Sequence, residues 1–295
     1  MKKLLFVYNP YAGKGLIKNK IADIISIFTR KDYLVTAYPT QRALDGYDKV
    51  CAADGMYDMI VCSGGDGTLN EIISAVMCHK EKRPEIGYIP AGTTNDFATT
   101  LKIPRNMIKA AENIADGTAF PCDIGKMNGR YFTYVAAFGL FTEVSYNTPQ
   151  KMKNIFGHQA YVLESIKSLS NIKAYNLVIT CDERVIKGCY IYGMVANSKS
   201  VGGFKGLTGK DVELDDGLFE VALVKKPENA IELQQIVAGV LNNKYESQMV
   251  ERFKTDHIII ESEESMAWTI DGENADEHQH VEIIVRRKAF DIVIS

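Results

Sequence analysis

The chain has 295 residues, of which 46% are hydrophobic and 24% are charged, and its formal net charge at pH 7 is −3. These values are typical of an ordinary globular protein of about two domains, and the lack of a basic excess argues against a nucleic-acid partner. No apolar run approaches the roughly 20 residues that a membrane-spanning helix needs. The six cysteines form no CxxC pair and no zinc-binding spacing, so we expect a reduced, cytoplasmic protein.

Residues 1–124 alternate short apolar runs with amphipathic stretches. The first apolar run, 4–8, is cut off by Asn9-Pro10, so we interpret it as a strand rather than as part of a signal peptide. The other predicted strands are 34–38, 59–62 and 86–89, and the predicted helices are 17–29, 42–53 and 69–78. Because the strands are almost continuously apolar, we predict an α/β domain with a parallel sheet covered on both faces.

From about residue 125 the pattern changes to strands separated by turns. The predicted strands are 131–138, 175–181, 189–197, 218–224, 257–261, 266–270, 281–285 and 290–294, and the predicted helices are 151–170 and 230–241. We therefore expect a first domain over 1–124 and a mostly antiparallel, β-rich second domain over 125–295, either a sandwich or a partly closed barrel. The cleft between the two domains is the natural place for a ligand.

A glycine-rich segment, Gly64-Gly65-Asp66-Gly67-Thr68, directly follows the apolar run 59–62. Glycine lets the backbone approach a ligand closely, and a turn of this kind before a helix offers its N–H groups to phosphate oxygens. The alternative is a simple helix start in which Thr68 is the N-cap and Glu71 reaches back to it.

Two further loops follow predicted strands. Asn9–Lys14 can bind phosphates through backbone amides and the Lys14 ammonium, or it is a turn with an exposed lysine; it does not match the Walker pattern. The segment 90–97 places Asp96 among small and hydroxylated residues, or it is a second helix start capped by Thr93 or Thr94. Because ligands bind beyond the carboxyl ends of parallel strands, we expect all three loops at one edge of the sheet.

The segments 64–71 and 90–98 together resemble the bacterial diacylglycerol kinases and the related sphingosine and ceramide kinases. The resemblance covers nearly the whole chain, because 123–125, 202–204 and 215–218 follow in the expected order, as does 271–273. The element at 64–68 alone is shared with NAD kinases and phosphofructokinases, whereas its pairing with 92–98 is more specific. The resemblance implies a nucleotide-binding α/β domain joined to a β-rich lipid-binding domain.

The resemblance implies transfer of the γ-phosphoryl group of ATP to a lipid hydroxyl, with Asp66, Asp96 and Asp123 organising catalytic Mg²⁺ and its waters. It implies nucleotide binding at Asn9, Pro10, Gly13, Lys14, Thr40, Gly64, Gly65, Gly67, Thr68, Glu71, Thr93, Thr94, Asn95 and Asp123. A lipid kinase of this kind meets the membrane surface while it acts, so the expected location is cytoplasmic with peripheral membrane association. A homodimer is left open.

The second half carries two acidic turns. By resemblance, the Asp216 carboxylate and backbone carbonyls near Glu213 and Leu218 form a structural or regulatory magnesium site; the alternative is an acidic turn before a strand. The segment 206–210 replaces the proline-bearing stretch that is customary there.

Asp271-Gly272-Glu273 lies between two predicted strands. Asp-Gly is a hairpin-turn signal, and the functional alternative makes Asp271 the general base that takes the proton from the lipid hydroxyl. Glu273 is a candidate for the same role, and we place Asp271 ahead of it.

Two weaker features complete the set. We interpret His278-Gln279-His280 as a polar loop rather than as a metal-binding pair. The apolar stripe of helix 151–170 is typical of a core-facing helix, and with Lys151, Lys153 and Lys167 it is also a candidate membrane contact.

Two other functions compete with a lipid kinase. A soluble-metabolite kinase such as NAD kinase shares the 64–68 element and a β-rich second domain, but this chain lacks the S-P-T-G-S-T-A-Y-like segment of NAD kinases. A non-catalytic nucleotide- or lipid-binding protein is the second competitor, and the presence of Asp66, Asp96, Asp216 and Asp271 argues against it.

Overall fold

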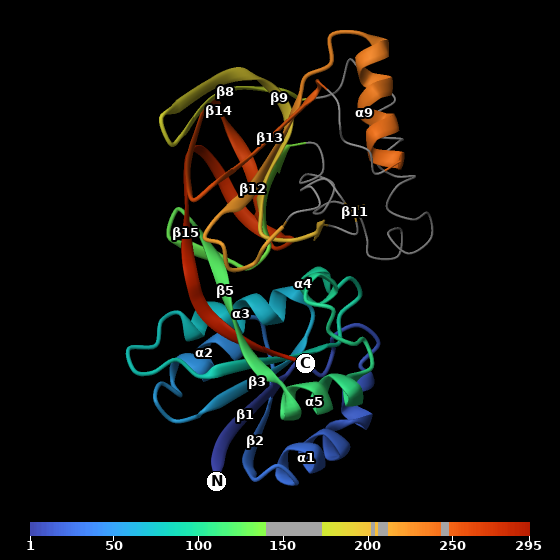
Figure 1. Cartoon of the computed structure of the whole chain (residues 1–295), viewed down its shortest axis with the longest axis vertical. Helices are drawn as coiled ribbons and strands as arrows, with labels where there is room; N and C mark the ends of the chain where they lie inside the picture. Colours follow the sequence, from blue (N-terminus) through green and yellow to red (C-terminus); the bar gives the residue numbers. More distant parts are fainter. Residues whose placement is uncertain (140–172, 202–203, 206–211, 243–247) are drawn as a thin grey trace. The chain divides into compact units, whose positions relative to one another are not determined.

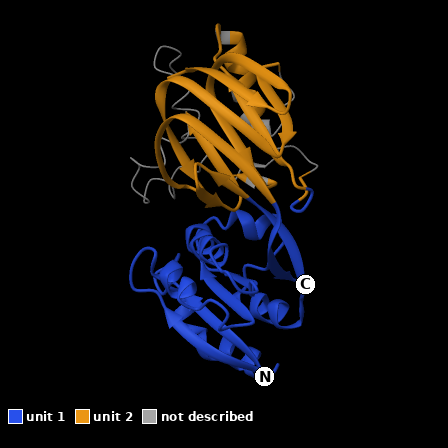
Figure 2. Cartoon of the chain, turned by 90° about the vertical axis from the view of Figure 1, so that its left-hand side faces the viewer, with its two compact units in different colours: residues 1–124, 214–216, 287–295 blue, residues 125–213, 217–286 orange. Residues whose placement is uncertain are grey.

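The computed structural model of the chain describes residues 1–139, 173–201, 204–205, 212–242 and 248–295. The chain divides into two compact units (Figure 2). Unit 1 consists of Met1–Ile124, Leu214–Asp216 and Arg287–Ser295, and unit 2 consists of Gly125–Glu213 and Gly217–Arg286. The sequence predicts that 214–216 and 287–295 belong to the second domain, whereas the structure places both short segments in unit 1.

Unit 1 is built around four strands, β1 (Lys2–Tyr8), β2 (Tyr33–Pro39), β3 (Met59–Gly64) and β4 (Glu85–Pro90). The pairs β1–β2, β1–β3 and β3–β4 are all parallel, so the four carboxyl ends point the same way (Figure 1). Ile292 of the last strand, β15, extends this sheet beside Ile86, also in the parallel sense. Every residue of β3 is buried, which fits its apolar sequence.

Helices cover both faces of this sheet (Figure 1). The helices α1 (Ile21–Thr29) and α5 (Met107–Asp116) pack on one face, where Phe28 and Ile114 join Phe6 and Val61 in a single apolar core. The other helices are η1 (Leu16–Asn19), α2 (Asp45–Cys51), α3 (Asp66–Val76) and the short α4 (Asp96–Thr100). The predicted helix 17–29 is thus split at Lys20, and α5 was not predicted.

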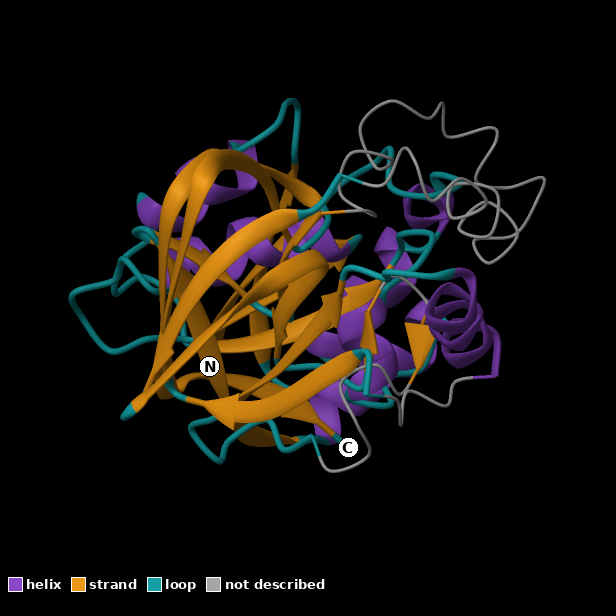
Figure 3. Ribbon diagram, turned by 90° about the horizontal axis from the view of Figure 1, so that it is seen from above, coloured by secondary structure: helices purple, strands orange, loops and turns teal. Residues whose placement is uncertain are grey.

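Unit 2 is dominated by strands (Figure 2), and the helices, strands and loops of both units are coloured in Figure 3. The strands of unit 2 are β6 (Arg130–Phe132), β7 (Val135–Gly139), β8 (Tyr175–Cys181), β9 (Arg184–Ala196), β10 (Ser200–Val201), β11 (Phe204–Lys205), β12 (Phe219–Lys225), β13 (Val250–Thr255) and β14 (His257–Ile270). Two long strands, β5 (Thr118–Met127) and β15 (Glu273–Ile294), contribute residues to both units. One helix of this unit is described, α9 (Ala230–Asn242).

The strands of unit 2 run in the order β13-β12-β9-β7-β14-β15, with β8 beside both β9 and β14. The pairs along this path are antiparallel. Aromatic side chains of these strands pack together: the ring centroid of Phe138 lies 4.9 Å from that of Trp268 and 6.3 Å from that of Tyr175. A β-rich second part with antiparallel pairing agrees with the sequence analysis.

Three details of unit 2 differ from the predictions. Residues 131–138 form two strands that are interrupted at Thr133 and Tyr134, not one. The separate strands predicted at 257–261 and 266–270 are one strand, β14, in which a register shift between Glu261 and Met266 accommodates the polar stretch between them. His278 and His280 lie in β15 rather than in a loop. The predicted helix 151–170 lies outside the described residues.

Candidate functional site

The loops that follow β1, β3 and β4 come together at the carboxyl edge of the parallel sheet. The backbone N–H of Asn9 donates to the carbonyl of Ser63 at 2.8 Å. The N–H groups of Ala91 and Gly92 donate to the carbonyl of Gly64 at 2.8 and 3.2 Å. Direct backbone contacts therefore join three segments that are far apart along the sequence.

Two glycines allow this close approach. A Cβ atom added to Gly92 would lie 2.6 Å from the Cα of Gly65, and one added to Gly13 would lie 2.4 Å from the carbonyl oxygen of Ala91. Gly13 also has a φ of +55°, a conformation that other residues adopt only with strain. Larger side chains at these positions would push the loops apart.

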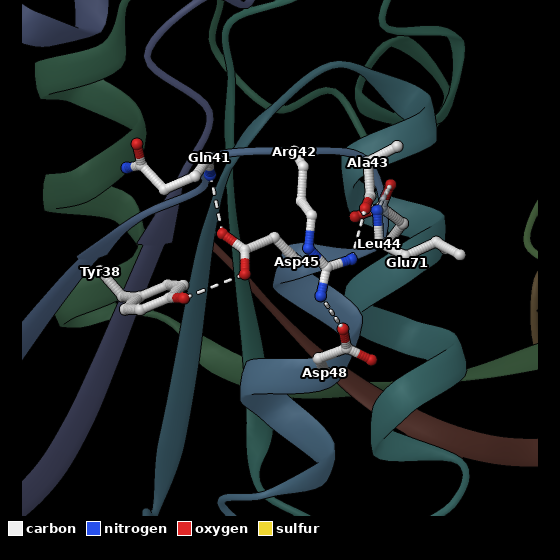
Figure 4. Close-up of polar contacts among 8 residues, drawn as sticks. All are labelled: Tyr38, Gln41, Arg42, Ala43, Leu44, Asp45, Asp48 and Glu71. Atoms are coloured by element: carbon white, nitrogen blue, oxygen red, sulfur yellow. Dashed lines mark hydrogen bonds and ion pairs between the residues drawn. The ribbon is translucent and has the colours of Figure 1, made fainter.

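The helix that follows β3 begins earlier than expected. Asp66 is the first residue of α3, and Gly65 is its N-cap in an extended conformation. The capping interpretation based on Thr68 is therefore wrong: Thr68 lies in the first turn, and Glu71 instead accepts the N–H of Leu44 at 3.1 Å (Figure 4). The first-turn N–H groups of a helix have no partner within the helix, so this end of α3 suits an anion.

The carboxylate of Asp66 links this loop to the next one. It accepts the backbone N–H groups of Asp96 at 3.2 Å and of Phe97 at 3.4 Å, which are in the first turn of α4. Asp96 itself is only 2% exposed. The two carboxylates that the sequence singled out thus lie at adjacent helix starts.

Asn95 holds the third loop in shape. It is the N-cap of α4 with a φ of +55°, so the alternative that Thr93 or Thr94 caps this helix is wrong. Its side-chain oxygen accepts the N–H of Gly92 at 3.0 Å and the hydroxyl of Tyr88 at 3.2 Å, and its side-chain nitrogen donates to the carbonyl of Gly92 at 2.8 Å. The side chains of Thr93 and Thr94 are left exposed.

Two carboxylates, Asp66 and Asp96, affect the polar groups around them. Burial, followed by the nearby Asp66, Cys62 and Asp96, holds the pKa of the Tyr88 hydroxyl well above its ordinary value. Among the described residues no group of three or more His, Cys, Asp or Glu side chains is placed to hold a metal. Mg²⁺ is commonly held by one or two carboxylates together with substrate phosphates and water, so Asp66 and Asp96 fit that ligand set.

Lys14 and Thr40 lie on the loops around the same sheet edge. The Lys14 side chain is exposed, and Thr40 is 7% exposed with its N–H bonded to the carbonyl of Tyr8, the last residue of β1, at 2.9 Å. The loop before Lys14 is folded by Asn9, whose side-chain oxygen accepts the N–H of Tyr11 at 2.9 Å. The chain therefore presents a cation and backbone amides in one loop.

Asp123 joins the two returning segments to unit 1. Its N–H donates to the carbonyl of Leu214 at 2.7 Å, and its side-chain oxygen accepts the N–H of Lys288 at 2.7 Å. Lys288 also pairs with the carboxylate of Asp215 at 3.4 Å. Asp123 is fully buried, so these bonds fix where both segments enter the unit.

The residues predicted to bind a second magnesium ion lie in one turn. Glu213 is exposed, and Asp216 and Leu218 are partly buried. Gly217, between the latter two, has a φ of +86°, as expected for a tight turn. A magnesium site at this turn stays a prediction.

Asp271 is the centre of a compact hydrogen-bond network in unit 2. One carboxylate oxygen accepts the N–H and the hydroxyl of Thr133, each at 2.7 Å, and the other accepts the N–H groups of Tyr134 and Val135, each at 3.0 Å. These bonds explain why the strand is interrupted between β6 and β7. Burial raises the pKa of Asp271, and the four donors act in the opposite direction. Glu273, two residues later, is exposed.

The sequence analysis missed the residues that support the predicted carboxylates. Thr133 is 138 residues away from Asp271, and Tyr88 contacts Asn95 from inside an apolar strand. Neither has a local signal, because an isolated threonine or a tyrosine in a strand is ordinary in any sheet protein.

Two family models together cover most of the chain. Residues 3–127 match the diacylglycerol kinase catalytic domain, and residues 136–292 match the YegS C-terminal NAD kinase beta sandwich-like domain. A two-domain kinase with a β-rich C-terminal domain is therefore the class of protein that this fold and these loops define.

Relatives and solved structures agree with that class. A diacylglycerol kinase of Staphylococcus epidermidis is 34% identical over 98% of this chain and 94% of its own length, and one of Bacillus subtilis is 34% identical over 92% and 90%. One solved structure from Bacillus anthracis, 27% identical, covers 100% of this chain and 95% of that one with a TM-score of 0.87. Another, a diacylglycerol kinase 24% identical, covers 100% and 97% with a TM-score of 0.79 and shows the shared fold. The chain belongs to the diacylglycerol kinase family.

Proposed function

We propose that this protein is an ATP-dependent lipid kinase that transfers the γ-phosphoryl group of ATP to the hydroxyl of diacylglycerol or a related lipid alcohol. The observation that carries the proposal is the convergence of the loops after β1, β3 and β4, with Asp66 bonded to the first turn of α4. Membership of the diacylglycerol kinase family supports it further. Among the described residues no helix is long and apolar enough to cross a membrane. We propose that the protein meets its lipid at the membrane surface, because the lipid alcohols of this proposal reside there.

In this proposal the loops of unit 1 bind the nucleotide. Backbone amides of Asn9–Lys14 and of the first turn of α3 hold the phosphates, and the Lys14 ammonium adds a positive charge. The remaining proposed nucleotide contacts are Thr40, Glu71, Thr93, Thr94 and Asn95. Asp66 and Asp96, with Asp123, hold magnesium and its waters. When bound, the metal neutralises the charge that develops on the transferred phosphoryl group.

We propose Glu273 rather than Asp271 as the general base, which reverses the preference drawn from the sequence. A general base needs a lone pair within hydrogen-bond reach of the substrate proton. A carboxylate has about four lone-pair positions, and Asp271 already accepts four hydrogen bonds. Glu273 is exposed, and Asp271 shapes the turn that carries it. Asp271 then acts as a positioning residue.

The magnesium site at Asp216 is a second part of the proposal. Oxygen ligands from Asp216 and from the carbonyls of Glu213 and Leu218 suit a hard cation. We propose that this ion has a structural or regulatory role and does not bridge phosphates.

One observation favours a different acceptor: residues 136–292 match a domain described as NAD kinase beta sandwich-like. The decisive experiment supplies labelled ATP and Mg²⁺ together with diacylglycerol in mixed micelles, other lipid alcohols, or NAD. We expect labelled phosphate in the lipid fraction and little in NADP. Labelled NADP without labelled lipid would overturn the proposal, and the absence of both a labelled acceptor and ADP release would point to a non-catalytic binding protein.

A further inference from the structure

Asn197 and Asp271 flank the dipeptide Tyr134-Val135 at the start of β7. The N–H of Asn197, just beyond the end of β9, donates to the carbonyl of Tyr134 at 2.9 Å. On the other side of β7, the N–H of Asp271 donates to the carbonyl of Val135 at 2.9 Å. The strand order β9-β7-β14-β15 therefore places Asn197, Asp271 and Glu273 at one end of the sheet of unit 2.

The side chains of Asp271 and Asn197 differ in their hydrogen bonding. The Asp271 carboxylate meets four donors, whereas neither the nitrogen nor the oxygen of the Asn197 amide has a hydrogen-bond partner among the residues that the structure describes. Asn197 is 0% exposed. A buried amide without partners destabilises a fold and is rare, so it calls for a specific explanation.

We propose that the Asn197 amide is a binding group for the acceptor, and that it pairs with a neutral oxygen function of the lipid, an ester carbonyl or a second hydroxyl. This inference rests on the proposed function. An amide offers both donors and an acceptor, which matches either group. The enclosed position disfavours a charged ligand, and the Asp271 carboxylate beyond β7 disfavours an anion in particular.

The strand spacing separates this role from that of Glu273. Asn197 follows β9 and Glu273 begins β15, three strands away, which corresponds to roughly 14 Å between their backbones. The amide thus reaches a part of the acceptor at some distance from the hydroxyl that reacts. Asn197 sets which acceptor binds and takes no part in the proton transfer.

The test compares Asn197→Leu with the wild-type protein and with Asn176→Leu, a matched change at an exposed asparagine of β8. Because Leu removes an unpartnered amide at similar volume, we expect an unchanged or higher Tm. We expect the KM for the lipid to rise about 10-fold, since one hydrogen bond is lost, with the KM for ATP unchanged. Asn176→Leu should leave both KM values as in the wild type.

Three acceptors identify the group that the amide contacts: a diester diacylglycerol, its diether analogue without carbonyls, and a monoacylglycerol with a second free hydroxyl. A KM increase for the diester but not for the diether supports the ester carbonyl, and one for the monoacylglycerol alone supports a hydroxyl. Asn197→Ala, which adds no bulk, should show the same separation of KM values.

Two results would overturn the inference. A lower Tm in both Asn197→Leu and Asn197→Ala, with wild-type KM values, would mean that the Asn197 amide stabilises the fold, for example through a bound water. Wild-type KM values on all three acceptors with an intact fold would show that it binds no part of the lipid. If the wild-type protein phosphorylates no lipid at all, the proposed function itself fails, and this outcome is separate from both.

Discussion

The carboxylate of Asp66 accepts the backbone N–H of Asp96 at 3.2 Å, so the first residue of α3 caps the first turn of α4. A side chain at one helix start thereby fixes the position of the next, 30 residues later in the chain. The same bond holds two carboxylates near each other at the edge of a parallel sheet, where their repulsion favours a bound cation.

Asp66→Asn should separate chemistry from folding. The amide oxygen of Asn can still accept one of the two N–H groups of α4, so we expect the melting temperature to stay within a few degrees of wild type. Loss of the charge should lower turnover about 100-fold or more, because the magnesium ion that neutralises the transferred phosphoryl group would lose a carboxylate ligand. The measurement is steady-state kinase activity together with thermal unfolding.

Asp54→Asn is the matched control for that change. Asp54 lies beyond α2 and accepts the N–H groups of Lys80 at 3.0 Å and Glu81 at 3.4 Å, away from the three loops. It should keep wild-type turnover. Equal activity of Asp66→Asn and the wild-type protein would remove Asp66 from the catalytic site.

Gly65→Ala should weaken ATP binding alone, whereas Gly92→Ala should also destabilise the fold. A Cβ on Gly65 would lie 3.5 Å from the Cα of Gly92, which is an ordinary contact, whereas a Cβ on Gly92 would lie 2.6 Å from the Cα of Gly65 and 2.8 Å from the side-chain oxygen of Asn95. Gly65→Ala should fold normally and raise the KM for ATP roughly 10-fold, since a methyl group crowds the phosphates.

Gly92→Ala should also lower the free energy of unfolding, by about 1–3 kcal/mol, because the loops must move apart. Urea unfolding and ATP titration measure the two effects. The interpretation of these loops as one phosphate site would be contradicted if both variants bound ATP as the wild-type protein does.

Local signals in the sequence account for much of unit 1. An apolar run followed by Gly64–Thr68 is enough to predict a buried strand, a close turn and a helix, and parallel pairing brings the three loops to one edge. The sequence does not predict where α3 and α4 begin. Gly65 and Asn95 are the N-caps of these helices and make no side-chain cap hydrogen bond, whereas the threonines nearby are more usual N-cap residues.

Long-range pairing accounts for what could not be predicted. The donors around Asp271 come from Thr133–Val135, which the sequence pattern predicts to lie inside a single strand. The return of 214–216 and 287–295 to unit 1 depends on bonds to Asp123. Such contacts leave no periodic pattern in the sequence, so the sequence alone does not distinguish the roles of Asp271 and Glu273.

Tyr38→Phe should remove an alkaline dependence of stability. The Tyr38 hydroxyl donates to Asp45 at 3.0 Å, and Asp45 also accepts the N–H of Gln41 at 2.7 Å (Figure 4). The hydrogen bond to Asp45, then burial and the charge of Asp45, raise the pKa of Tyr38 above its ordinary value near 10. The folded chain thus holds the phenolic proton more tightly than the unfolded chain does.

This contribution of Tyr38 is fully present below pH 10 and is lost as the pH rises through the raised pKa. Thermal unfolding between pH 8 and pH 11 should show a steeper alkaline decline for the wild-type protein than for Tyr38→Phe, which begins from a lower Tm at pH 8. Parallel curves would show that the hydroxyl titrates alike in the folded and unfolded states.

Glu273→Gln and Asp271→Asn provide the sharpest test of the two acidic positions. Glu273 is exposed, so Glu273→Gln should unfold like the wild-type protein while its kcat falls by 100-fold or more, about the contribution of a general base. Asp271→Asn places an NH₂ group where two N–H or O–H donors point. It should therefore lower the free energy of unfolding by about 2–4 kcal/mol.

Thr133→Val, which removes only the hydroxyl donor to Asp271, is the control for the network. It should produce a smaller stability loss of about 1 kcal/mol and a kcat close to wild type. If Asp271 were the base, relieving one of its four hydrogen bonds would shift the acidic limb of the kcat–pH profile, whereas Glu273→Gln would keep that limb. Loss of the limb in Glu273→Gln with no shift in Thr133→Val is the pattern that assigns the proton transfer to Glu273.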